Sequence, residues 1–225
     1  MEEVLVCEGI SMTYTSGGTA QPVLNGVSVR LNRGEACLLL GPSGSGKTTL
    51  LSILGCLLTP SAGSMRIENE PVDFTSRQRL IKTRRRLIGF VFQQAQLLPF
   101  LSAEENVHIV LANGKADGRS DLATTRAIMD RLGIRHLARK KPGQLSVGER
   151  QRVSIARALA KKPAILLADE PTASLDWKNG QAAVQLLLEQ ARATNALLVA
   201  VSHDVRLVQM FDRVFELDNG ELIET

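Results

Sequence analysis

The 225-residue sequence is poor in aromatic residues and in cysteine, and it contains no long hydrophobic run. Aromatic residues make up 4% of the chain, so leucine, isoleucine, valine and alanine must build the core. No apolar stretch approaches the roughly 20 residues that a helix needs to span a bilayer. The acidic start, Met1-Glu2-Glu3, is unlike a signal peptide. If the protein works at a membrane, we therefore expect another chain to supply the membrane part.

The three cysteines, Cys7, Cys37 and Cys56, lie within apolar stretches and show no metal-ligand spacing. Their odd number and apolar surroundings predict buried free thiols in a reducing compartment.

A strong excess of one charge is also missing. The chain has 27 Lys and Arg against 23 Asp and Glu, a formal net charge of +4. The dense basic run is Arg84-Arg85-Arg86, preceded by Arg77, Arg79 and Lys82. Nucleic acid or anionic lipid could face this run, but a solvated helix face is the more common origin of such a pattern. We expect no nucleic-acid partner.

The chain length fits one domain, and short apolar runs rich in β-branched residues alternate with stretches of helical period. This alternation predicts an α/β fold with a largely parallel sheet. Several of the runs are almost wholly apolar, as expected for strands covered on both faces. The expected strands are Ala36–Leu40, Ile88–Phe92, Ala164–Ala168, Ala196–Val201 and Arg213–Leu217.

Two regions depart from that alternation. The opening segments, Val4–Tyr14 and Val23–Leu31, are typical of antiparallel strands, separated by the loop at residues 16–18. Residues 93–161 favour helix without strand: Ser102 and Glu105 have capping-box spacing, and Asp121–Leu132 has a helical pattern closed by a glycine. We predict one domain over residues 1–225. Its α/β core and antiparallel subdomain take residues 1–92 and 162–225, and a helical subdomain takes residues 93–161.

The clearest motif is Gly41-Pro42-Ser43-Gly44-Ser45-Gly46-Lys47-Thr48, which matches the phosphate-loop pattern G-x-x-x-x-G-K-[ST]. A buried strand is predicted before it, and an apolar helical stretch, 49–58, after it. Glycines let the backbone curl so that N–H groups can face phosphate oxygens at a helix N-terminus. Lys47 would reach the β and γ phosphates, and the Thr48 hydroxyl would ligate Mg²⁺. With Thr49, the whole run is predicted to bind nucleotide.

Two carboxylates, Asp169 and Glu170, end the apolar run at 164–168. They lie at the carboxyl end of a strand, where open α/β sheets bind ligands. Asp169 is suited to hold Mg²⁺, and Glu170 is suited to polarise an attacking water as a general base. A surface turn would explain the pair alone, but beside a phosphate loop it supplies the metal carboxylate that ATP chemistry requires.

A third element is Leu145–Gln151, in which Ser146 and Glu149 have capping-box spacing before a helix that continues to Lys161. A plain capped helix start is an adequate explanation. A helix N-terminus with a Ser hydroxyl and the flexible Gly148 is also a good anion site.

Taken together in this order, the three elements resemble the ATP-binding cassette (ABC) family over nearly the whole chain, and its P-loop NTPase (RecA-like) core. The resemblance implies adenine stacking on Tyr14, a Mg²⁺ and water contact at Gln93, and a γ-phosphate contact at the switch residue His203. It also implies that Ser146-Val147-Gly148-Glu149 is the family signature, and that Ser174-Leu175-Asp176 crosses to a partner subunit and contacts its nucleotide. The predicted catalytic residues are Lys47, Gln93, Glu170 and His203, and the predicted metal ligands are Thr48, Gln93 and Asp169.

Some of these assignments have alternatives. Tyr14 could be a packing residue of a strand, and Gln94 could take the place of Gln93. His203 could be a helix-entry residue only. The signature departs from the usual Ser-Gly-Gly-Gln of the family: Val147 restricts the backbone and Glu149 adds a negative charge. Because Glu serves a capping box as well as Gln, we expect an active signature.

The resemblance further implies ATP and Mg²⁺ as cofactors, a homodimer that forms on ATP, and a separate transmembrane permease. The segment from Gln93 to Asn106 resembles the lipoprotein-releasing, macrolide-exporting and heterocyst glycolipid-exporting ATPases. That group implies export or extraction of a lipidic or amphipathic substrate, a periplasmic adaptor in some systems, and a place at the cytoplasmic face of the inner membrane. The alternative is a regulatory ATPase of the cell-division type, which signals through a permease-like partner without transport.

Overall fold

The computed structural model describes residues 2–17, 19–111 and 118–225. In this part of the chain a six-stranded sheet forms the centre, and its strand order is β10-β9-β3-β8-β7-β6. β10 is antiparallel to β9, and the remaining neighbours pair in parallel. In that order the strands are Glu221–Glu224, Arg213–Asp218, Ala36–Leu40, Leu197–Val201, Ile165–Asp169 and Ile88–Val91. The α/β prediction with a largely parallel sheet is confirmed.

A second, antiparallel sheet has the order β2-β1-β4-β5. Its strands in that order are Thr19–Asn32, Glu3–Ser16, Ala62–Ile67 and Glu70–Pro71. β1 pairs with both β2 and β4, and its register shifts between Cys7 and Ile10, next to Gly9 with φ of +64°. Such irregularities bend a long strand. The predicted antiparallel subdomain is therefore present at the N-terminus.

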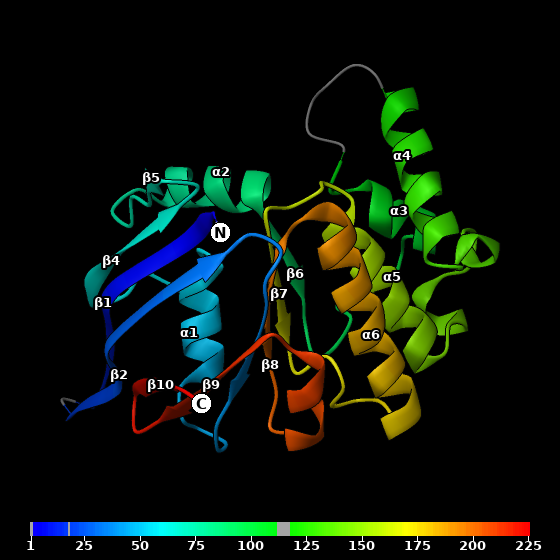
Figure 1. Cartoon of the computed structure of the whole chain (residues 1–225). Coiled ribbons are helices and arrows are strands. Elements are labelled where there is room, and N and C mark those ends of the chain that lie inside the picture. The colour runs from blue at the N-terminus through cyan, green and yellow to red at the C-terminus, as the bar shows by residue number, and fades with distance from the viewer. Residues whose placement is uncertain (1, 18, 112–117) are drawn as a thin grey trace.

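Helices cover both faces of the central sheet (Figure 1), with α1 between the two sheets and α5 and α6 on the opposite face. α3, α4 and α5 follow one another between β6 and β7, without a strand in the described residues there. The α-helices are α1 (Lys47–Leu54), α2 (Arg77–Leu87), α3 (Ala103–His108), α4 (Gly118–Arg131), α5 (Val147–Leu159) and α6 (Trp177–Thr194). Short 3₁₀ helices are η1 (Arg135–Leu137), η2 (Pro142–Gln144) and η3 (Val205–Met210).

Alternate residues of β3 point into two separate hydrophobic clusters. Leu38 belongs to the cluster under α3, α4, α5 and α6, whereas Cys37 and Leu39 belong to the cluster that β3 shares with α1 and the antiparallel sheet. Successive side chains of a strand point to opposite faces, so a strand buried on both faces is apolar throughout. This explains the unbroken apolar run that ends at the phosphate loop.

Helix ends differ from the predicted ones where tertiary contacts decide. α1 ends at Leu54 rather than near residue 58, because Cys56 leaves the helical conformation with a φ of +53°. Gly55 is needed there, since a Cβ would lie 2.1 Å from the Phe90 ring. The predicted capping box of Ser102 and Glu105 is confirmed at the start of α3. Part of the predicted loop at residues 16–18 lies outside the described residues.

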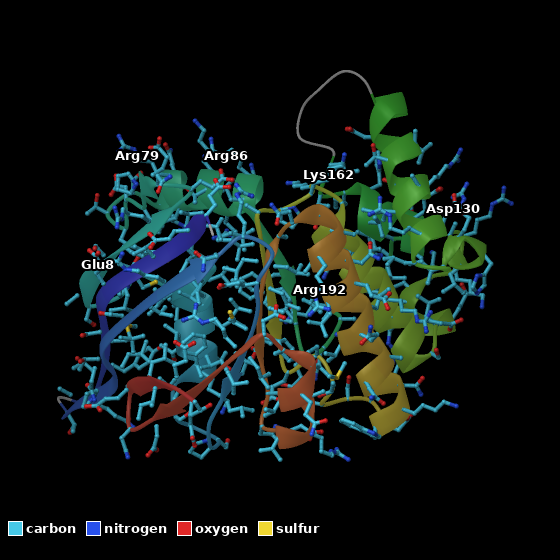
Figure 2. All side chains as sticks on the ribbon, in the orientation of Figure 1. Glu8, Arg79, Arg86, Asp130, Lys162 and Arg192 are labelled. Carbon is cyan, nitrogen blue, oxygen red and sulfur yellow. The ribbon has the colours of Figure 1, made fainter. Side chains whose placement is uncertain are left out.

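The basic run forms α2, whose side chains Leu80 and Leu87 are buried while its cations are mostly exposed. Figure 2 shows Arg79 and Arg86 on the outside of this helix. Arg79 pairs with Asp73 at 3.0 Å, and Arg84 Nη1 donates to the carbonyl of Cys56 at 2.8 Å. These contacts agree with a solvated helix face.

The three cysteines are free and buried, as predicted. Burial raises the pKa of Cys7 and Cys37 to about 12 and that of Cys56 to about 11. Within the described residues, no helix has both the length and the apolar character needed to cross a membrane.

Candidate functional site

The phosphate loop joins β3 to α1, and its shape requires glycine at two positions. Gly41 has a φ of +147°, and a Cβ there would lie 2.3 Å from the carbonyl oxygen of Leu217. Gly46 has a φ of +101°, and a Cβ there would lie 2.9 Å from Val23 Cγ1. Because both contacts are with segments of the protein that pack against the loop, side chains at these positions would deform the loop.

Lys47 is the first residue of α1, and it is 7% exposed. Its Nζ donates to the carbonyls of Gly41 and Pro42, at 2.7 Å each. These bonds hold the two ends of the loop together. An ammonium group has three donors, so one remains for a ligand.

Thr48 and Asp169 meet at the carboxyl edge of the sheet, where Thr48 Oγ1 donates to Asp169 Oδ1 at 3.3 Å. Burial raises the pKa of Asp169, with a further contribution from Glu170, while Thr48 and Lys47 act in the opposite direction. A hydroxyl and one carboxylate beside a phosphate loop fit Mg²⁺, which commonly takes one or two carboxylates together with substrate phosphates. The described residues contain no group of three or more His, Cys, Asp or Glu that could hold a metal, so the phosphates would have to complete the ligand set.

Glu170 follows the end of β7 with a φ of +44°, a conformation that residues with a side chain rarely adopt. Its backbone N–H donates to the carbonyl of Val201 at 3.0 Å, which holds this conformation. His203 Nδ1 lies 3.1 Å from Oε1 and 3.0 Å from Oε2 of Glu170. Oε2 is shielded from solvent and accepts no hydrogen bond from the described residues. An oriented carboxylate with a free oxygen is suited to accept a proton.

Most of these groups line one cleft of about 500 Å³; Gly41 and Asp169 do not, and Asp169 is linked to the cleft through its hydrogen bond with Thr48. Tyr14 of β1 lies at its wall, where the hydroxyl is 3.5 Å from Thr49 Oγ1 and the side chain is partly exposed. The wall is lined by Tyr14, Val23, Ser43, Gly44, Gly46, Lys47, Thr48, Thr49, Gln93, Glu170, Ala173 and His203. Ten of these twelve residues were predicted from the sequence. The predicted residues Pro42 and Ser45 line a second hollow of about 450 Å³ on the other side of the loop.

Gln93 lines the cleft two residues after the end of β6, whereas Gln94 does not line it. The carbonyl of Gln93 accepts a hydrogen bond from Ser174 Oγ at 3.4 Å. This geometry favours Gln93 over Gln94 as the residue that faces a bound ligand.

The signature residues are not part of the cleft. Ser146 caps α5: its Oγ accepts from Glu149 N at 3.2 Å, and Glu149 Oε2 accepts from Ser146 N at 2.7 Å. The predicted capping box is confirmed. The backbone N–H of Ser146 lowers the pKa of Glu149, with a smaller effect of Lys140, whose Nζ is 4.0 Å away. Gly148 is in the first turn of the same helix.

Asp176 is also outside the cleft, at the N-cap of α6. Its Oδ1 accepts from the backbone N–H of Asn179 at 3.0 Å, and its Oδ2 accepts from the Asn179 side chain at 2.6 Å. Within one chain the carboxylate therefore has a structural partner and no access to the cleft.

Three residues near the site were not predicted. Val23 and Ala173 line the cleft with apolar surface, and neither carries a chemical signal in the sequence. Arg157 of α5 donates to the carbonyls of Ala95 and Gln96, just after Gln93. Its position in an amphipathic helix gave no indication of this contact, because arginine is common on exposed helix faces.

The geometry defines a phosphate-binding α/β domain with a metal-suited carboxylate and a candidate general base. The sequence pattern of the ABC transporter family matches residues 24–173. The lipoprotein-releasing system ATP-binding protein LolD 1 of Rhodopirellula baltica is 43% identical over 222 residues, 98% of this chain and 96% of that protein. The macrolide export ATP-binding/permease protein MacB of Escherichia coli is 40% identical over 99% of this chain, which spans 34% of that longer protein.

Among solved structures, the dimeric ATP-binding cassette MJ0796 in a post-hydrolysis state with ADP and phosphate superposes with a TM-score of 0.89. It is 37% identical, with 98% of this chain and 97% of that chain covered. The chain belongs to the ABC transporter family. The predictions of the family, the fold class and an ATPase cassette are confirmed at this level.

Proposed function

We propose that the chain is the ATP-hydrolysing subunit of an exporter, and that two copies close on ATP to drive a separate permease. The observation that carries this proposal is that residues of the phosphate loop and the Glu170–His203 pair line one cleft, and that Asp169 accepts a hydrogen bond from Thr48, which lines the same cleft. The substrate class, lipidic or amphipathic, is supported by the names of the lipoprotein-releasing and macrolide-exporting relatives.

In this proposal the loop 41–48 and Thr49 bind the phosphates of ATP, while Tyr14 supports the adenine ring. Lys47 turns its remaining donor to the β and γ phosphates. Thr48 and Asp169 would hold Mg²⁺, and Gln93, which lines the same cleft as Thr48, would contact it. When bound, Mg²⁺ neutralises charge on the phosphate oxygens.

Glu170 acts as the general base for hydrolysis. Its carboxylate accepts a proton from a water that attacks the γ phosphate. His203 keeps the carboxylate in place through Oε1, and its exposed ring can also reach the γ phosphate. Positioning and charge stabilisation then account for most of the rate, because phosphoryl transfer demands little covalent chemistry from the protein.

A second copy completes each site. Ser146, Gly148, Glu149 and Asp176 are outside the cleft of their own chain, so they can reach an ATP only in a partner. ATP then bridges two chains, and nucleotide binding stabilises the dimer by mass action. The dimeric state of the solved cassette agrees with this arrangement. We place the dimer at the cytoplasmic face of the inner membrane, held there by its permease.

The test is a reconstituted complex. Affinity purification of the tagged chain from membranes should recover a permease and, where the system has one, a periplasmic adaptor. Cargo movement by that complex in vesicles should require ATP and stop in Glu170→Gln. ATP turnover without cargo movement would instead indicate the regulatory alternative, and recovery of no membrane protein would contradict both.

A further inference from the structure

The segment between β6 and α3 contains neither helix nor strand, although Gln93 lies near its start. Such a segment needs restraint from its neighbours if Gln93 is to keep one position in the cleft. Gln96 has a φ of +43°, in the left-handed region that residues with side chains seldom adopt. A strained conformation of this kind persists only where the surroundings hold it.

Arg157 of α5 provides that restraint. Its Nη2 donates to the carbonyl of Ala95 at 2.9 Å, and its Nη1 donates to the carbonyl of Gln96 at 2.8 Å. A planar guanidinium bound to two consecutive carbonyls fixes both the place and the direction of the backbone. Burial lowers the pKa of Arg157.

The remaining anchors of the segment lie on either side of this contact. Gln93 is tied by its carbonyl to Ser174 at 3.4 Å, a long hydrogen bond. Asn106 of α3 is fully buried and bonds to both backbone groups of Leu98 and to the carbonyls of Leu101 and Ser102. Residues 94–97 therefore depend on Arg157 for their polar anchoring within the described chain.

Packing against α5 does not replace that anchoring. A groove of about 370 Å³ separates residues 94–97 from the first half of α5. Gln151 lines the groove, and its buried Nε2 has no hydrogen-bond partner among the described residues. Among the described residues, the polar link between this segment and α5 is thus the two bonds of Arg157, while Leu97 adds packing against the hydrophobic cluster that includes α5.

We propose that Arg157 is a positioning residue for ATP hydrolysis, which sets the place of Gln93 by holding Ala95 and Gln96 against α5. The inference rests on the proposed role of Gln93 beside Mg²⁺ and the attacking water. Ser146 is the N-cap of α5. The helix that presents the signature to the partner's ATP therefore also holds Gln93 in the cleft of its own chain, so each site is tied mechanically to the other.

A double-mutant cycle tests the proposal in the full chain. Arg157→Met and Gln93→Ala should each lower kcat about 10- to 100-fold, because a small displacement of a positioned group has an effect of this size. The double variant should be slowed about as much as either single variant, within about twofold, since both changes remove the same positioned group. Arg84→Met is the matched control: it also loses a hydrogen bond to a backbone carbonyl, far from the cleft, and should keep the parent kcat.

Measurements other than turnover separate positioning from folding. Hydrogen exchange at the amides of residues 94–97 should become faster in Arg157→Met, while the amides of α1 keep their protection. Arg157→Lys keeps the charge but not the two-point contact, so it should recover only part of the lost kcat and remains testable if the Met variant is unstable.

The outcomes distinguish the two ideas. Losses that multiply in the double variant would overturn the positioning role of Arg157 and leave the role of Gln93 intact. A Gln93→Ala variant with the parent kcat would overturn the proposed role of Gln93 itself. Unchanged exchange at residues 94–97 in Arg157→Met would show that the segment is held by something else.

Discussion

Two helices of this protein directly follow a predicted phosphate-binding residue, and their N-termini are built in opposite ways. α1 is preceded by Gly46, which offers no side-chain cap. α5 is preceded by Ser146, whose hydroxyl and partner Glu149 form a complete capping box. The first N–H groups of a helix have no intrahelical acceptor. At α1 they stay available for a ligand, whereas at α5 two of the backbone N–H groups at this end are already satisfied.

The carboxylates beside the two helices differ in the same sense. Burial raises the pKa of Asp169 next to the phosphate loop, and a backbone N–H lowers the pKa of Glu149 at the signature. A desolvated carboxylate gains from a bound cation, while one already held by N–H donors has little to gain from a ligand. This difference agrees with the proposed two-chain site, in which the phosphate loop would bind Mg²⁺ and nucleotide and the signature would contact a nucleotide that another chain holds.

The largest expected effect on ATP hydrolysis comes from Glu170→Gln, which leaves the phosphate loop intact and removes the proposed general base. We expect kcat to fall about 100- to 10,000-fold, with ATP binding kept and an ATP-bound dimer accumulating. Size-exclusion chromatography with ATP and a turnover assay measure both results. A variant that stays monomeric in saturating ATP would contradict the two-chain site.

Lys47→Ala should weaken ATP binding by the phosphate loop itself. Lys47 holds the carbonyls of Gly41 and Pro42 and has a third donor for phosphate. Loss of charge-assisted bonds of about 1.5 to 3 kcal/mol predicts roughly 10- to 150-fold weaker ATP binding, measured by titration calorimetry. Lys82→Ala, on the exposed face of α2, is the control and should bind ATP as the parent does. Near-normal binding and hydrolysis by Lys47→Ala would rule out the loop assignment.

Ser146→Arg should distinguish the role of the signature from that of the phosphate loop. We expect ATP affinity of the monomer to be kept and turnover to fall about 10- to 100-fold, because the lost phosphate contact lies in the partner's site. Ser102→Arg destroys the equivalent capping box of α3 and controls for the loss of a cap. Equal loss of turnover in both variants would mean that the signature acts only as a helix cap.

The smallest effect concerns the charge of Glu149. Its pKa is lower in the folded protein than the ordinary 4.5. The folded state then binds fewer protons than the unfolded chain, so this contribution to stability is present at neutral pH and is lost as the pH falls through the folded pKa.

Glu149→Gln keeps the capping geometry without the titration. Urea unfolding in steps below pH 4.5 should show a weaker loss of stability in Glu149→Gln than in the parent. Glu105→Gln, in the box of α3, shows whether such a difference belongs to any capping box. Identical acid sensitivity of parent and Glu149→Gln would exclude this contribution.

The sequence predicted best what is encoded in consecutive residues. The phosphate loop and both capping boxes depend on local spacing, and they lie where they were expected. The pairing of Glu170 with His203 joins residues that follow two different strands, β7 and β8, and only the family resemblance brought them together. The need for glycine at position 55 comes from the ring of Phe90, a contact between distant segments. Arg157 was missed for the same reason: its partners are backbone carbonyls about 60 residues away, which no spacing reveals.

The position of β3, the strand before the phosphate loop, has a consequence for co-translational folding. β3 is made early, but its neighbours in the sheet are β8 and β9, the second of which ends at Asp218. Gly41 lies directly against the carbonyl of Leu217. A nascent chain therefore carries a complete phosphate-loop sequence long before it can hold that loop in shape. We expect nucleotide binding to be acquired only as the last residues leave the exit tunnel, so that a truncated product is made without an active ATP site.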